Sequence, residues 1–82
     1  MHRFFFDLLV DNVVKLDPGG MVFEQARATT VVADEMARHL FVWRDDLRGR
    51  DAWIRVRDNI GREIYRAAVW AENEEKVGWD QA

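Results

Sequence analysis

The stretch from Phe23 to Val42, FEQARATTVVADEMARHLFV, is the only long segment of the chain with a helical period. At about 100° per residue, a stripe of apolar and small residues forms along one side of a helix. The charged residues of the segment fall away from this stripe. Small alanines near its middle would let the helix backbone lie close to a sheet. The members of the predicted stripe are Phe23, Ala26, Thr30, Ala33, Ala37, Leu40 and Phe41.

The segments before the helix have the character of strands. Arg3–Val10, RFFFDLLV, is short and aromatic-rich, which predicts a strand with apolar residues on both faces. Asp7 in its middle is a candidate ligand or base, or else it faces solvent or meets an arginine across the sheet. Val13–Leu16 is a candidate second strand, and Asp17–Gly20, DPGG, predicts a break before the helix.

The segment after the helix, Ala52–Val69, predicts a β-hairpin around the turn Asp58–Gly61. Aspartate at the first turn position and glycine at the fourth suit a type I turn with Gly61 at positive φ. If a four-residue loop sets the register, Arg57 faces Arg62. This register gathers arginines beside a tryptophan on one face and leaves Glu63 poorly placed on the other. The resulting candidate binding surface consists of Trp53, Arg55, Arg57, Arg62 and Arg66.

The composition excludes several kinds of function. Eighty-two residues are enough for one domain with a thin core. Because the chain has no cysteine, disulfides, zinc–thiolate sites and thiol nucleophiles are excluded. No apolar run approaches the roughly 20 residues that span a bilayer, and the first ten residues lack the pattern of a signal peptide. We therefore expect a cytoplasmic location with no membrane contact.

The charge of the chain is uneven. The net charge is −3, which counts against a general nucleic-acid binder. Residues 44–69 nevertheless carry seven arginines against five acidic residues, and residues 70–82 are acidic. We expect 70–82 to be a partly ordered acidic tail outside the domain. Its Glu72, Glu74 and Glu75 are candidates to fold back over the arginines.

Several short motifs together resemble a small bacterial family of domains of unknown function. They are the opening Arg3-Phe4-Phe5-Phe6-Asp7, the later Asp17…Gly20, the alanine-rich helix, and the closing Ile54-x-Val56-x-Asp58-x-x-Gly61-Arg62. The resemblance covers roughly residues 3–69. It implies one helix on a small sheet, and it supplies no activity and no catalytic residue.

The sequence thus predicts an α+β domain over residues 1–69, with one helix packed on a mainly antiparallel sheet in the order β-(β)-α-β-β. Its expected function is non-catalytic protein interaction or regulation, with nucleic-acid or anion binding by the arginine-rich surface as the alternative. Candidate partners are an acidic protein and a second copy of the chain, joined through an exposed sheet edge. We expect no cofactor and no metal. An enzyme would have to use residues whose spacing implies no cooperation, namely Asp7, His39, Asp45, Asp46 and Tyr65.

Overall fold

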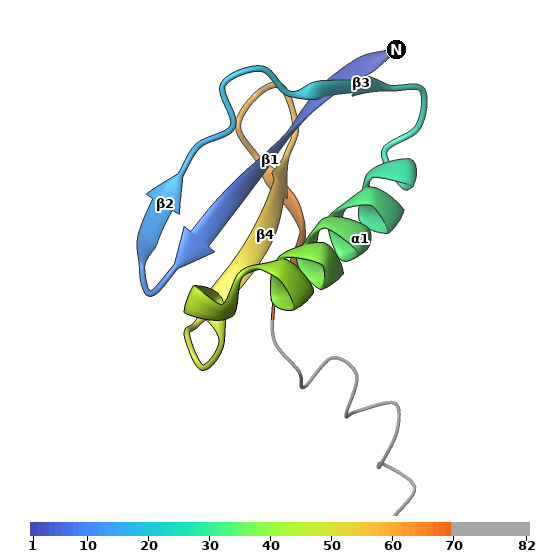
Figure 1. Ribbon diagram of the computed structural model, residues 1–82. Helices are drawn as coiled ribbons and strands as arrows, with labels where there is room; N and C mark the ends of the chain where they lie inside the picture. The colour runs from blue at the N-terminus through green and yellow to red at the C-terminus, as the bar shows by residue number, and fades with distance from the viewer. Residues whose placement is uncertain (70–82) are drawn as a thin grey trace, which may run out of the picture.

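The computed structural model describes residues 1–69 and has an α+β fold in which one helix packs on a five-stranded antiparallel sheet (Figure 1). The predicted fold class is confirmed, and a third strand precedes the helix, so that the order is β-β-β-α-β-β. The predicted tail, 70–82, lies outside the described residues. The elements are β1 (His2–Val10), β2 (Val13–Lys15), β3 (Met21–Phe23), α1 (Ala28–Trp43), the 3-10 helix η1 (Asp45–Leu47), β4 (Ala52–Arg57) and β5 (Glu63–Ala68).

The long strand β1 is the centre of the sheet. The strand order is β2-β1-β4-β5, and β3 pairs with the first residues of β1. Asp11 and Asn12 join β1 to β2 with φ values of 50° and 75°. Positive φ at both residues is the geometry of the tight hairpin turn whose twist matches the flanking strands. The candidate second strand at Val13–Leu16 is therefore present as β2, over Val13–Lys15, and it pairs antiparallel with β1.

The helix begins at Ala28, and the predicted start at Phe23 is wrong. Met21–Phe23 forms β3 instead, pairing with β1 from His2 opposite Phe23 to Phe4 opposite Met21. The Phe23 ring lies against those of Phe4 and Phe6, with centroids 6.0 and 5.9 Å away. Strand pairing and these aromatic contacts outweigh a helical pattern that was weak at its N-terminal end.

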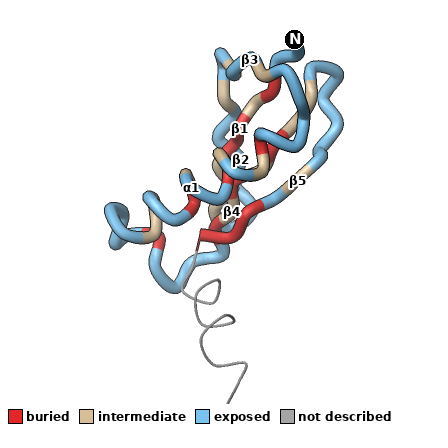
Figure 2. The backbone as a smooth tube through the Cα atoms, turned by 90° about the vertical axis from the view of Figure 1, so that its right-hand side faces the viewer, coloured by how far each residue is buried: buried red, intermediate tan, exposed pale blue. Residues whose placement is uncertain are grey.

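The alanine side of α1 packs on the sheet as predicted. Ala33 and Ala37 are almost completely buried. Thr29 rather than Thr30 is the buried threonine, and its Oγ1 donates a hydrogen bond of 2.6 Å to the carbonyl of Ala26. Figure 2 shows buried residues concentrated in β1, β4, the end of β5 and the inner side of α1. The core therefore lies between the helix and the strands β1, β4 and β5.

The hairpin of β4 and β5 has the predicted turn but not the predicted register. Gly61 has φ +89°, and its N–H donates to the carbonyl of Asp58, as a type I turn requires. The first hydrogen bond between the two strands joins the Asp58 N–H to the Arg62 carbonyl, which leaves a three-residue loop. The register then shifts by one residue between Val56 and Arg57. The resulting bulge at Ile64 shifts the strands, so that the predicted pairing is wrong.

The bulge explains why a charged residue, Glu63, can occupy the first position of β5 without being buried. In the predicted register Glu63 lay on the buried face of the hairpin. In the structure it lies opposite Arg57, and Arg55 lies opposite Arg66. The extra residue brings Glu63 to the face that carries the arginines, where its carboxylate is solvated and paired. The division of β4 into two faces was predicted correctly, whereas the partners across the hairpin were not.

Within residues 1–69, no helix combines the length and the apolar character needed to cross a membrane. The expected cytoplasmic location stays a prediction.

Candidate functional site

The face of the sheet opposite α1 carries most of the predicted site. Burial alternates along β4, with Ala52, Ile54 and Val56 buried toward the helix and the residues between them only half-buried. These half-buried residues, with one neighbour from β5, form what we call the arginine face. It consists of Trp53, Arg55, Arg57 and Arg66. The fifth predicted residue, Arg62, lies apart from this face, in the turn between β4 and β5.

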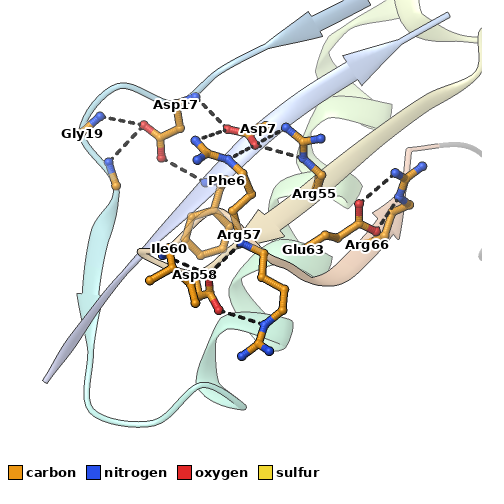
Figure 3. A network of polar contacts seen from close by, with 12 residues as sticks. Phe6, Asp7, Asp17, Gly19, Arg55, Arg57, Asp58, Ile60, Glu63 and Arg66 are labelled. Carbon is orange, nitrogen blue, oxygen red and sulfur yellow. Dashed lines mark hydrogen bonds and ion pairs between the residues drawn. The ribbon is translucent and has the colours of Figure 1, made fainter. Parts of the chain in front are cut away.

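Asp7 of β1 lies at the centre of the arginine face and is fully buried. Its Oδ2 accepts hydrogen bonds from Arg55 Nε and Nη2 at 3.0 and 2.7 Å, and from Arg57 Nε at 2.5 Å. Its Oδ1 accepts from Arg57 Nη2 at 3.1 Å. Figure 3 shows this carboxylate between the two guanidinium groups. Of the roles considered for Asp7, the meeting with an arginine across the sheet is therefore confirmed, and Asp7 meets two.

The surroundings of Asp7 lower the pKa of its carboxyl group. Burial alone would raise this pKa because it disfavours the charged form. Hydrogen bonds from Arg57, from the backbone N–H of Asp17 and from Arg55 outweigh burial and hold the pKa below its ordinary value. The same contact raises the pKa of Arg57. These contacts therefore favour the ionised carboxylate of Asp7.

The loop between β2 and β3 covers the other side of Asp7. The backbone N–H of Asp17 donates to Asp7 Oδ1 at 2.9 Å, and Asp17 Oδ2 accepts from the Phe6 N–H at 3.1 Å. Asp17 Oδ1 accepts from the backbone N–H groups of Gly19 and Gly20 at 3.1 and 3.2 Å, as Figure 3 shows. Asp17 thus occupies the gap along β1 between β2 and β3, and it fixes this loop against the sheet.

Arg66 has a carboxylate partner of its own. Its Nε and Nη2 donate to the two Glu63 oxygens at 3.0 Å each, and its guanidinium lies 5.5 Å from the centre of the Trp53 ring. The Arg57 guanidinium lies 4.8 Å from the centre of the Phe5 ring. Each guanidinium of the arginine face therefore donates two hydrogen bonds to a carboxylate, and two of the three also stack on an aromatic ring.

Arg62 differs from the arginines of this face. Its Nε lies 3.4 Å from Asp58 Oδ2, and its side chain is 74% exposed. The Asp58 carboxylate is already engaged by the backbone N–H groups of Ile60 and Arg62 at 3.1 and 2.8 Å. The largest cause of the lowered pKa of Asp58 is the hydrogen bond from the Arg62 backbone N–H. Arg62 is thus the least firmly held of the five predicted residues.

The other candidates for catalysis are His39, the adjacent Asp45 and Asp46, and Tyr65, and each contacts a nearby side chain. The Tyr65 hydroxyl donates to Asp34 Oδ1 at 2.7 Å, which raises the pKa of Tyr65. His39 stacks on Trp43 with centroids 6.2 Å apart. Asp45 and Asp46 form ion pairs with Arg48 and Arg44 at 3.4 and 2.9 Å. In the part of the chain that the structure describes, no three histidine, aspartate or glutamate side chains gather as a metal site would require.

The predicted masking of the arginines by Glu72, Glu74 and Glu75 concerns residues outside those described.

Among residues 1–69, the site contains one participant that was predicted only as part of a break, Asp17. The signal for it was present in the sequence. Aspartate two and three residues before Gly19 and Gly20 is the pattern in which the side chain caps its own turn.

Comparison with known proteins places the chain in a family but gives it no activity. A family described as Domain of unknown function (DUF6894) matches residues 3–70, and the chain belongs to this family. No curated protein and no solved structure matches the chain. The predicted membership in a family of unknown function is confirmed to this extent.

Proposed function

We propose that this chain is a small non-catalytic module that binds another protein through the arginine face. The observation that carries this proposal is the fixed geometry of the guanidinium groups. Arg55 and Arg57 are both held by Asp7, and Arg66 is held by Glu63. A side chain that is already immobilised loses less conformational entropy when a partner binds. Arginine and aromatic residues are also the types most enriched at the centres of protein interfaces.

The charge balance of the arginine face favours a protein partner over nucleic acid. Its three arginines lie against the carboxylates of Asp7 and Glu63, and Asp17 lies behind Asp7. Nucleic-acid affinity comes mainly from cations that replace counterions on phosphate groups. A guanidinium that already has a carboxylate partner would have to exchange that partner for a phosphate and gains little. This argument also supports partners that are not strongly acidic, including a second copy of the chain.

The catalytic candidates support the non-catalytic part of the proposal. Asp7 is neutralised by two arginines, and the pKa of Tyr65 is raised rather than lowered. Neither environment prepares its side chain for proton transfer near neutral pH.

The test is affinity capture with the tagged full chain from its native host, quantified by mass spectrometry. Arg66→Ala removes an exposed part of the arginine face, and Arg38→Ala on the outer side of α1 is the matched control. Both variants should melt like the parent. We expect at least one protein to be lost with Arg66→Ala and kept with Arg38→Ala, and to bind the parent again after purification. If Arg66→Ala retains every captured protein, the proposed function is wrong.

Two further measurements separate the alternatives. Light scattering across a concentration series shows whether the captured partner is a second copy of the chain. A mobility-shift titration with duplex DNA between about 50 and 200 mM salt tests the nucleic-acid alternative. Binding that falls steeply with salt and is lost with Arg66→Ala would replace the proposed protein interaction with nucleic-acid binding.

A further inference from the structure

A hollow of about 340 Å³ lies between the start of β1 and the turn of the β4–β5 hairpin. It exists because the pairing of β1 with β4 ends at Phe5 and Arg57, while β1 continues for several residues beyond. Its volume is at the lower end of the range for ligand sites, and it is open to solvent. The apolar residues that line it are Phe4, Ala26, Ile60 and Ile64.

Two arginines, Arg3 and Arg62, line the same hollow together with one acidic residue, Asp58. Arg3 Nη1 donates to the Gly19 carbonyl at 2.7 Å, and Arg3 forms no ion pair within residues 1–69. Arg62 has only the 3.4 Å contact with Asp58 described above. Because two arginines stand against one aspartate, the hollow retains positive charge beside its apolar side chains.

The two isoleucines in the hollow are not explained by the needs of the turn. Ile60 is 76% exposed at a turn position where small polar residues usually occur. Ile64 is the extra residue of the bulge and is 38% exposed. Bulges commonly redirect a side chain, and this one directs Ile64 to the hollow. Exposed apolar groups beside this surplus of positive charge suit a ligand that is apolar and anionic at once.

The backbone of β1 suggests the form of that ligand. The Phe6 N–H and the Phe4 carbonyl both point toward the β2–β3 side, to Asp17 and Gly20. Because backbone groups alternate along a strand, those of Arg3 point the opposite way, toward the hairpin turn. In the described part of the chain, β1 has no strand partner on that side beyond Phe5. An extended peptide can pair with such an open stretch of strand.

We propose that this hollow binds an extended segment of another protein that carries an apolar side chain next to a carboxylate. The apolar side chain contacts Ile60 and Ile64, and the carboxylate pairs with Arg3 and Arg62. The proposal goes beyond the proposed function, which concerns the arginine face. It uses a surface separate from the arginine face, so that the two can fail independently.

The test is a peptide-display selection on the full chain, with counter-selection on the Arg3→Gln/Arg62→Gln variant. We expect the enriched peptides to place Asp or Glu beside Leu, Ile, Phe or Met. For a synthesised winner, each single arginine variant should weaken binding by about tenfold, the loss typical of one charge-assisted hydrogen bond. Ile60→Asn should weaken it as well, and Arg38→Gln should leave it unchanged. Thermal melting confirms that each variant is folded.

Three results would overturn the proposal. The first is enrichment of peptides without acidic residues, and the second is affinity that survives Arg3→Gln/Arg62→Gln. The third concerns the chain itself. If a synthetic peptide of residues 70–82 competes as well as the selected peptides, the occupant is the chain's own terminal segment and not another protein. None of these results changes the outcome of the capture experiment with Arg66→Ala, which tests the proposed function separately.

Discussion

Asp7→Asn is the change that tests the arrangement of the site most directly. Asparagine has nearly the same shape as aspartate, so packing is preserved while the negative charge is lost. The amide oxygen can still accept the hydrogen bond from Asp17, but the amide nitrogen points a donor at guanidinium donors. Arg55 and Arg57 would then repel each other across a site that excludes water from residue 7.

The expected loss in the free energy of unfolding follows from the contacts of Asp7 with Arg55 and Arg57. Removing one partner of a buried ion pair costs about 3–5 kcal/mol, because the remaining charge is left uncompensated. Here the side chains of Arg55 and Arg57 are 20% and 21% exposed, so that each can turn partly toward solvent. We therefore expect a loss of about 3 kcal/mol, at the lower end of that range. A domain of this size is stabilised by roughly 4–12 kcal/mol in total, so that the variant should fold but be much less stable.

Urea unfolding followed by circular dichroism measures this loss. With a slope of about 1 kcal/mol per molar urea, the midpoint should fall by about 3 M. Asp46→Asn, which removes an exposed carboxylate paired with Arg44, is the matched control and should change the midpoint far less. If Asp7→Asn unfolds at the same urea concentration as the parent, Asp7 does not hold the arginines as described.

The pH dependence gives an independent check on the same residue. The folded pKa of Asp7 is below its ordinary value of 3.8, so that the ionised group stabilises the fold above that value. This stabilisation is lost as the pH falls below about 4 and toward the folded pKa. Asp17 has a lowered pKa for a similar balance of causes, with burial opposed by backbone hydrogen bonds from Phe6, Gly20 and Gly19. The parent should therefore lose stability in acid more steeply than Asp7→Asn, and equal slopes would contradict the assignment.

Three further substitutions test the fold by the same unfolding measurement. Gly20→Ala should cost more than about 2 kcal/mol, because Gly20 has φ +71° and an added Cβ would lie 2.7 Å from the Phe4 carbonyl oxygen. Gly49→Ala, also at positive φ but with open space around it, is its control and should cost about 1 kcal/mol. Ala37→Leu should cost roughly 1–3 kcal/mol by overpacking the contact of helix and sheet, and a parent-like midpoint would mean that this contact is loose. Gly61→Val should cost more than about 1 kcal/mol because a β-branched residue tolerates positive φ poorly, and no loss would refute the turn.

The sequence predicted the fold class because its strongest patterns are local. The alternation along β4 and the alanines of α1 each report which side of an element is buried, and both were interpreted correctly. The start of the helix could not be predicted in this way. Phe23 fits the apolar side of a helix and the apolar face of a strand equally well. Only its contact with Phe4 and Phe6, some 17 to 19 positions earlier in the chain, decides between the two structures.

The register of the second hairpin was mispredicted for a similar reason. The turn from Asp58 to Gly61 was recognised, but a turn sequence does not reveal a bulge one strand residue later. Long-range contacts favour the bulge. They place Tyr65 on the helix side, where its hydroxyl reaches Asp34, and they leave Glu63 beside Arg66 on the open face. The predicted surface kept four of its five residues because a shift of two positions preserves the faces of a strand.

The pairing of β1 with β4 is fixed by more than apolar pattern, and Asp7 is the reason. Leu8 opposite Ile54 and Phe6 opposite Val56 place apolar residues under the helix. A slip of one residue would exchange the faces of one strand relative to the other and bring either Arg55 or Asp7 to that side, at a cost of several kcal/mol for the buried charge.

In the native register, Asp7 lies directly opposite Arg55 and diagonal to Arg57, so that a single carboxylate reaches both. The carboxylate is in turn bonded to the loop that precedes β3. One buried charge therefore links three segments that are distant in sequence. Because the same charge orients two guanidinium groups of the arginine face, the contact that selects the register of the sheet also prepares the surface proposed to bind a partner.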